Sequence, residues 1–216
     1  EIKYMTAKEE DILTSQNLIK KGLVIDRLLN SLILTEGVVA DDLVVGDKNG
    51  LMVAARILAY GPEYEAEITN PNTGETFNHT FNLAECEFKK IPDDVDGNLF
   101  DFELPVSKHK ITFKLLNGKD EQAINKDIEA LKKVNQDVVP ELTTRLRYIV
   151  KAVDGDETPA TINNYVQNML SKDSLELRKE ITRISPDINM EREIDMGGEM
   201  VSVTIPMTSN FFWPNT

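Results

Sequence analysis

Apolar residues follow a helical spacing over the first third of the chain. Thr6 and Glu9 have the spacing of a capping box, which marks the start of a helix. The pattern continues to about Leu34, and Ser15 and Gly22 are expected to interrupt it. A further helix is predicted to begin at the N-cap Asp47 and to end at Gly61, before Pro62. Residues 1–61 are therefore predicted to form a helical N-terminal region.

The period changes to two between residues 62 and 117. Two pairs of segments place apolar residues at every second position, which predicts antiparallel hairpins with one apolar face. The first pair is Tyr64, Ala66 and Ile68 with Phe77, His79 and Phe81, and the second is Phe100, Phe102 and Leu104 with Ile111, Phe113 and Leu115. Residues 62–117 are predicted to form two β-hairpins.

The helical spacing returns over residues 118–185, where four helices are expected. The second of them has Pro140 in its first turn and is predicted to continue through Val150 and Val153, until Asp154-Gly155-Asp156 ends it. Ser185-Pro186 ends the fourth. This part of the chain is predicted to be a helical middle region.

Residues 186–216 are predicted to form a C-terminal hairpin with an aromatic tail. Gly197-Gly198 is typical of a two-residue turn. Pairing through that turn sets Ile194 opposite Val201, Arg192 opposite Val203 and Met190 opposite Ile205. The predicted fold class is α+β, folded as one or two compact units.

The first hairpin turn suggests a zinc ribbon that lacks its metal. Asn70 and Thr73 stand where a Cys-x-x-Cys pair would hold zinc, and Gly197-Gly198 occupies the comparable turn of the last hairpin. The chain has 1 cysteine and 2 histidines, too few for a structural zinc site of four such ligands. No metal and no cofactor is predicted, so packed apolar faces must stabilise the hairpins.

Charge limits the classes of partner. The chain of 216 residues has a formal net charge of -13, which disfavours nucleic acid and favours basic protein partners. Its longest apolar runs fall far short of the ~20 residues of a membrane span, so no membrane association is predicted. A single cysteine, Cys86, fits a reducing compartment and a buried, inert thiol.

Catalytic motifs are absent from the sequence. It contains no phosphate-binding P-loop, no HExxH zinc helix and no GxSxG nucleophile. His79 falls on an apolar face, where a packed role is expected, and His109 lies in a turn. The acidic loops at Asp93 and Asp154 lack the glutamate that an EF-hand needs at position twelve. We predict that the protein is not an enzyme and has no catalytic residues.

The tail residues Phe211, Phe212 and Trp213 are the candidate interaction anchors. Aromatic side chains bury large areas and are favoured at the centres of protein interfaces. The alternative is that they dock into the chain's own core and fix the C-terminus. A helical seam formed by residues such as Leu28 and Leu32 is a second candidate interface, although core packing is expected there.

Several segments together resemble a known family. They are MTAKEEDIL with LIKKG, VVGDKNGLMVAARILAYGPEYE, FKLLNGKDEQAI, and ISPDI with DMGGEMVSVTIPMTSNFFWP. In this order they are similar to the baseplate hub assembly protein of T-even-type contractile-tailed bacteriophages, over residues 5–214. In some relatives the hairpin turns carry Cys-x-x-Cys, from which this chain departs at Asn70 and Thr73.

The resemblance implies a non-enzymatic protein of the phage tail baseplate hub, acting as a structural subunit or assembly factor. The implied partners are other hub proteins, tape-measure proteins or further copies of the chain. The implied location is the virion tail baseplate, or the host cytoplasm during assembly. One alternative is a tail assembly chaperone that is absent from the mature virion. Two rivals from other classes are a degenerate zinc-ribbon nucleic-acid adaptor and an enzyme with an unfamiliar carboxylate site.

Overall fold

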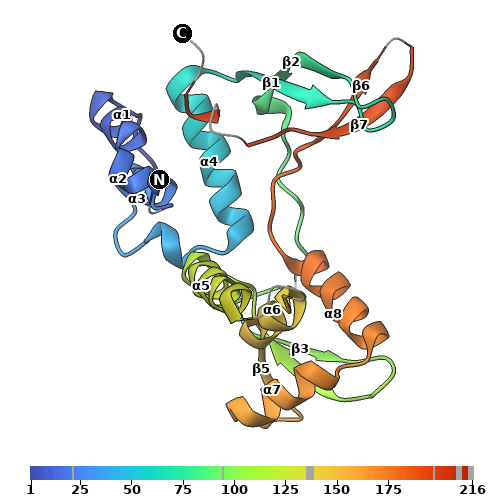
Figure 1. The fold of residues 1–216 in the computed structure, drawn as a ribbon. Coiled ribbons are helices and arrows are strands. Elements are labelled where there is room, and N and C mark those ends of the chain that lie inside the picture. The colour runs from blue at the N-terminus through green and yellow to red at the C-terminus, as the bar shows by residue number, and fades with distance from the viewer. Residues whose placement is uncertain (21, 94, 135–138, 197, 208–210, 214–216) are drawn as a thin grey trace. The chain divides into compact units, whose positions relative to one another are not determined.

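The computed structural model describes residues 1–20, 22–93, 95–134, 139–196, 198–207 and 211–213. It confirms the α+β class (Figure 1). The chain divides into two compact units. Unit 1 comprises residues 1–40, 46–89 and 187–216, and unit 2 comprises residues 41–45 and 90–186. The two hairpins predicted within residues 62–117 belong to different units.

Unit 1 begins with three short helices, α1 (Ala7–Thr14), α2 (Gln16–Lys20) and α3 (Val24–Leu32). The predicted breaks at Ser15 and Gly22 are confirmed. At the start of α1, the backbone N–H of Thr6 donates to the Glu9 carboxylate at 2.9 Å, as a capping box requires. The short 3₁₀ helix η1 (Ala40–Asp42) precedes the next helix.

Helix α4 (Val45–Tyr60) begins two residues before the predicted N-cap Asp47, so that prediction was wrong. The backbone N–H of Val45 donates to the carbonyl of Leu116 at 3.1 Å, a long-range bond that a local cap signal does not reveal. The predicted end is confirmed. Gly61 follows Tyr60 with φ +84°, a left-handed conformation that suits glycine at a helix end.

Two hairpins complete unit 1; the first has the predicted apolar face, and the second has the predicted register. Strand β1 (Glu63–Thr69) pairs with β2 (Thr76–Asn82), which sets Tyr64 opposite Phe81 and Ile68 opposite Phe77. Strand β6 (Glu191–Asp195) pairs with β7 (Met200–Thr204), and Ile194 lies opposite Val201 as predicted. Gly198 has φ +97°, whereas Gly197 lies outside the described residues. The 3₁₀ helix η2 (Leu83–Glu85) follows β2.

The core of unit 1 draws on most of these elements. Its buried side chains come from α1, α3, α4, both hairpins and the tail; they include Leu13, Leu28, Leu32, Val53, Tyr64, Phe81, Val201, Phe211 and Phe212. The segments that lead to and from unit 2 pair with each other, since Lys89 N–H donates to Asp187 and Asn189 N–H donates to Glu87, both at 2.8 Å. The longer segment of unit 2, residues 90–186, is thus inserted between two segments of unit 1 that pair with each other.

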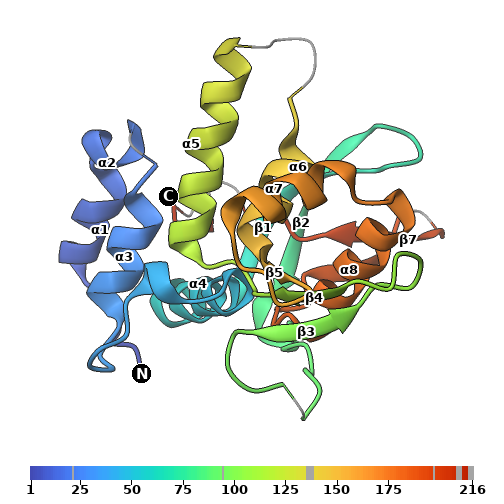
Figure 2. The same ribbon diagram turned by 90° about the horizontal axis from the view of Figure 1, so that it is seen from below.

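Unit 2 contains a three-stranded antiparallel sheet in the order β3 (Phe100–Glu103), β4 (Lys110–Phe113) and β5 (Val150–Val153). Its helices are α5 (Gly118–Val134), α6 (Glu141–Ile149), α7 (Pro159–Asn168) and α8 (Ser171–Ile184). Figure 2 shows the sheet beside α7 and α8, and one cluster of buried apolar side chains joins the sheet to α6, α7 and α8.

Strand β5 corrects the prediction of a helix that continues to Val153. Helix α6 starts after Pro140 and ends at Ile149, and Val150–Val153 pairs with β4. The four residues Val-Lys-Ala-Val suit both helical and alternating patterns. The open edge of β4 decides between the patterns, because a third strand satisfies backbone groups that a two-stranded sheet would leave exposed.

Candidate protein-binding groove

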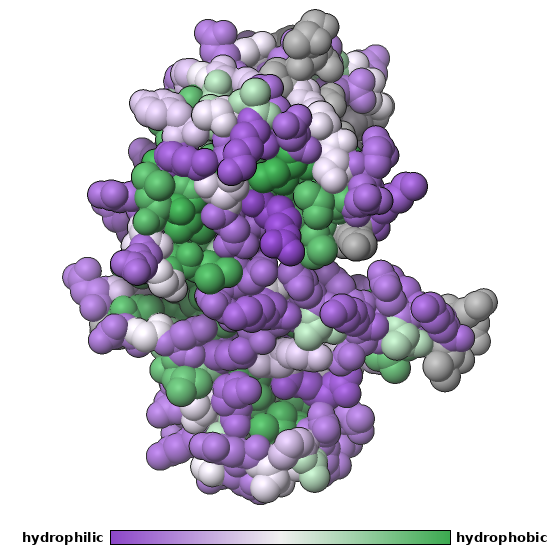
Figure 3. All heavy atoms as spheres, turned by 90° about the vertical axis from the view of Figure 1, so that its left-hand side faces the viewer, coloured by the Kyte–Doolittle hydropathy of each residue, from purple (hydrophilic) through white to green (hydrophobic). Residues whose placement is uncertain are grey.

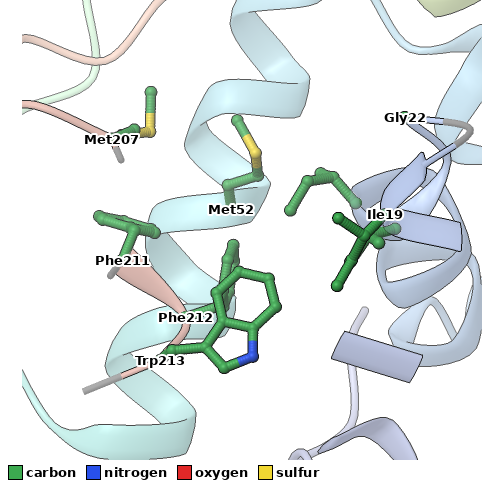
Figure 4. A pocket seen from close by; sticks show the side chains of 9 residues that line it. Ile19, Gly22, Met52, Met207, Phe211, Phe212 and Trp213 are labelled. Atoms are coloured by element: carbon green, nitrogen blue, oxygen red, sulfur yellow. The ribbon is translucent and has the colours of Figure 1, made fainter. Parts of the chain in front are cut away.

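An apolar groove lies in unit 1, with a volume of about 310 Å³. Figure 4 shows Ile19 on one side, the tail aromatics on the other, and Met52 of α4 between them. The lining residues are Ile19, Gly22, Val24, Ile25, Met52, Met207, Phe211, Phe212 and Trp213.

The first wall is shaped by the turn between α2 and α3. The N–H of Gly22 donates to Ile19 and the N–H of Leu23 donates to Leu18, both at 3.0 Å. With Gly22 at φ +67°, this is a Schellman motif. The turn leaves Ile19 45% exposed at the groove, while Val24 is 7% exposed and belongs to the core.

The second wall is the C-terminal segment. Phe211 and Phe212 are 2% and 3% exposed, and their rings meet edge-on at 5.2 Å. Phe211 also packs edge-on against Tyr64 at 5.1 Å. Two of the three candidate anchors therefore lie in the chain's own core, which is the alternative considered from the sequence. Trp213 is half-buried and lines the groove.

Tyr64 and Arg56 fix the position of this tail. The Tyr64 hydroxyl donates to the carbonyl of Pro206 at 2.8 Å. The guanidinium of Arg56, which is 3% exposed, lies 5.8 Å from the centre of the Tyr64 ring and donates to the carbonyls of Gly61 and Glu63. Burial lowers the pKa of Arg56, although the nearby Tyr60 and Tyr64 oppose that shift. The buried Arg56 thus joins the end of α4 to β1, against which the tail packs.

The groove can bury an apolar group, and none of the described residues that line it has an ionisable side chain for acid–base chemistry. Met52 and Met207 add flexible, polarizable side chains of the kind found at adaptable binding surfaces. Figure 3 shows apolar patches among hydrophilic side chains on the face that carries α1–α3. Ile19, Leu34 and Val39 are exposed apolar residues of the N-terminal region.

The other residues singled out by the sequence lie outside the groove. Cys86 is 8% exposed, and burial raises the pKa of its thiol. His79 is half-buried with its ring edge-on to Phe81 at 4.7 Å. The Asn70 side-chain oxygen accepts from the N–H groups of Asn72 and Thr73, so hydrogen bonds hold the turn where a zinc ribbon has its metal. The described part of the chain has no group of three or more His, Cys, Asp or Glu placed to hold a metal ion.

Unit 2 contains a polar cluster that the sequence did not reveal. His109 Nδ1 lies 2.5 Å from the Asp154 carboxylate, and Ser107 Oγ lies 3.1 Å from the Tyr165 hydroxyl. Asp173, fully buried, accepts from the N–H groups of Val106 and Ser107. Ser107 is thus paired with a tyrosine and not with the histidine, so these contacts lock the β3–β4 turn and do not form a nucleophile–base pair.

Sequence patterns did not predict Ile19, Met52 or Met207 as groove residues. Their positions in the sequence do not distinguish them from core residues. Ile19 follows the apolar spacing of its helix, and only the three-dimensional structure shows that it is exposed. No helix within the described ranges combines the length and apolar character of a bilayer span.

Comparison with known proteins gives one result. The model of a family described as T4 bacteriophage base plate protein matches residues 1–213. The comparisons with curated proteins and with solved structures give no match. The chain therefore belongs to the T4 bacteriophage base plate protein family, which gives it a structural role in the tail baseplate among other baseplate proteins.

Proposed function

We propose that this chain acts at the baseplate hub, as a non-enzymatic structural subunit or assembly factor that binds other hub or tape-measure proteins. The observation that carries the proposal is the match to the baseplate family over residues 1–213, nearly the whole chain. The similarity of the quoted segments to hub assembly proteins supports the narrower assignment to the hub. The exposed apolar groove supports a mechanism based on protein–protein binding.

Within this proposal, Phe211, Phe212 and Trp213 remain the interaction anchors, with different tasks. The two buried phenylalanines hold the tail on unit 1, and Trp213 presents its ring to the groove. The expected occupant is an apolar side chain of another hub or tape-measure protein. Tryptophan is enriched among interface hot spots, and methionine is enriched at protein interfaces in general.

The decisive experiment is mass spectrometry of purified tails together with affinity capture from infected cells. A fixed ratio to other hub proteins in the tail would identify a structural subunit. Absence from tails, with capture of an identified hub or tape-measure protein, would identify an assembly chaperone. Absence from tails and capture of neither class would contradict the proposal.

The anchors are tested in the same assay with Trp213→Ala. We expect at least a tenfold loss of the captured hub or tape-measure protein, because truncating a hot-spot aromatic typically costs about 2 kcal/mol or more. Tyr4→Ala is the matched control, since Tyr4 is an aromatic residue of unit 1 that is 69% exposed and outside the groove. An equal loss in both variants would remove Trp213 from the proposal.

A further inference from the structure

Two strand edges of unit 1 face each other without pairing. The hairpins β1–β2 and β6–β7 form separate two-stranded sheets (Figure 1). A cavity of about 350 Å³ lies between β1 and β7, lined by Glu67, Ile68, Thr69, Pro71, Ser202, Val203, Thr204 and Pro206. Consecutive residues of both strands line this gap, so the strands present their edges to it.

Side chains bridge the gap at both ends and show the directions of the strands. The Tyr64 hydroxyl reaches the Pro206 carbonyl at 2.8 Å, and the Asn72 amide reaches the Glu199 carboxylate at 3.4 Å. Residue numbers therefore rise along β1 as they fall along β7, so the two strands run antiparallel.

The hydrogen bonds of the first hairpin show which groups of β1 point into the gap. Leu83 N–H donates to Pro62 and Asn70 N–H donates to Glu75, both at 2.8 Å, so even-numbered residues of β1 bond to β2. In an antiparallel ladder the intervening residues direct their N–H and C=O groups away from the partner. Those residues are Glu65, Glu67 and Thr69.

The same argument applies to β7. Ile205 N–H donates to Met190 and Met196 N–H donates to Glu199, both at 2.8 Å, so odd-numbered residues of β7 bond to β6. The outward groups belong to Met200, Ser202 and Thr204. Among the described residues, no backbone hydrogen bond from outside their own hairpins reaches Glu67, Thr69, Ser202 or Thr204. Both sides of the gap thus offer unpaired backbone donors and acceptors.

Charge and burial define the chemistry of an occupant. Glu63, Glu65 and Glu67 form an exposed row on β1, and the residues opposite them on β2 are the neutral Asn82, Thr80 and Asn78. The opposite face of the hairpins is apolar and buried at Ala66, Ile68, Val201 and Val203. Acidic residues outnumber basic ones in unit 1, so the row has no surrounding excess of positive charge.

We propose that the gap between β1 and β7 binds an extended segment of a partner protein as a fifth strand, with basic residues alternating with β-branched ones. The segment would complete a sheet in the order β2, β1, partner, β7, β6. Its basic side chains would lie beside Glu65 and Glu67, and its β-branched side chains beside Ile68 and Val203. Backbone pairing would supply affinity and the alternating side chains specificity. A second copy of the chain is a poor occupant, because it brings the same acidic balance. The inference concerns the surface alone and does not depend on the assignment to the hub.

The test uses the full chain and a nine-residue peptide of alternating lysine and valine. Binding is followed by fluorescence anisotropy, and the site is located by hydrogen exchange. We expect protection of residues 65–69 and 200–204, and weaker binding as salt rises. The same peptide with alternate backbone nitrogens methylated should bind at least tenfold more weakly, and a peptide of alternating glutamate and valine should not bind.

Two variants test separately the backbone edge of β7 and the negative charge of β1. Ser202→Pro removes an outward N–H and should weaken binding at least tenfold. The double variant Glu65→Lys with Glu67→Lys leaves the backbone intact and should abolish binding. Glu36→Lys is its control, because Glu36 is an exposed carboxylate of unit 1 outside both hairpins.

Three results would overturn the inference. Equal binding of the methylated peptide would mean that only charge is recognised. Protection at the outer edges of β2 or β6 would place the peptide elsewhere. Self-association of the chain that protects residues 65–69 and 200–204, with no binding of the peptide, would assign the gap to a second copy.

Discussion

The second hairpin, β3–β4, differs from the other two because a third strand covers one of its edges. Strand β4 is covered by β5, where Lys114 N–H donates to Ile149 at 2.9 Å and Asp154 N–H donates to Lys110 at 2.8 Å. Among the residues that the structure describes, the hairpins of unit 1 have no third strand, and β1 and β7 present open edges to a shared gap. Unit 2 thus satisfies its sheet from its own chain, whereas unit 1 keeps the capacity to pair with another chain. The same local element serves as a closed scaffold in one unit and as an open surface in the other.

The largest contrast is expected from truncating one phenylalanine in each hairpin. Phe113 of β4 is 0% exposed, so Phe113→Ala should lower the free energy of unfolding of unit 2 by about 3–5 kcal/mol. Phe77 of β2 is half-buried, and Phe77→Ala should cost unit 1 about 1–2 kcal/mol. Urea unfolding, followed by hydrogen exchange of peptides from each unit, measures both. Equal costs would mean that the third strand does not tighten the packing of its sheet.

Asp173 provides the next test of unit 2. Burial alone would raise the pKa of Asp173, but hydrogen bonds from Val106 and Ser107 outweigh it and hold the pKa below its ordinary value. Asp173→Ala would leave two buried N–H donors without an acceptor and should cost roughly 3 kcal/mol. The same urea experiment measures it. Asp96→Asn, an exposed carboxylate of the same unit, should change stability by less than about 0.5 kcal/mol. A cost below about 1 kcal/mol for Asp173→Ala would show that the β3–β4 turn does not depend on this carboxylate.

The hairpins and the buried carboxylates show what the sequence could and could not predict. Alternation predicted the apolar face of the first hairpin, because a shift of one residue would turn Tyr64 and Ile68 to solvent. It did not predict β5, whose four residues follow a helix directly and pair only with a distant strand. The Asp173 contacts span more than sixty positions, and burial of Glu9 depends on Lys3 and Ser31. Likewise, the sequence predicted that the aromatic tail would be buried or would bind a partner. It did not predict that Phe211 and Phe212 would be buried while Trp213 lines the groove.

Glu9 makes the stability of unit 1 dependent on pH. The Glu9 carboxylate is 0% exposed, and hydrogen bonds from Lys3, then Thr6 and Ser31, hold its pKa far below the ordinary value of 4.5. Because the folded-state pKa is lowered, this contribution is present above pH 4.5 and is lost as the pH falls toward the folded-state pKa. Glu9→Gln should therefore cost about 2 kcal/mol at neutral pH and flatten the acid dependence of unit 1.

Trp213 fluorescence measures this prediction, since the chain has 1 tryptophan and it lies in unit 1. Urea midpoints are compared between neutral pH and about pH 3, where protonation of an ordinary carboxyl is largely complete. Asp11→Asn, an exposed carboxylate of α1, is the control and should change stability at neutral pH by less than about 0.5 kcal/mol. An acid dependence unchanged by Glu9→Gln would assign it to other carboxyl groups.

The smallest expected effect is a change in stability of opposite sign when a glutamate is replaced by lysine in β3 and in β1. Glu103 of β3 lies opposite Lys110, whereas Glu65 of β1 lies opposite the neutral Thr80 and between Glu63 and Glu67. Glu103→Lys should therefore destabilise unit 2, and Glu65→Lys should stabilise unit 1, each by roughly 0.2–0.5 kcal/mol at low salt. Added salt should shrink both changes, and urea unfolding at two salt concentrations measures them. If replacing Glu65 stabilises unit 1, the presence of a glutamate there is better explained by a role in binding than by a role in folding. Destabilisation by Glu65→Lys would remove that argument for a basic partner at the open edge.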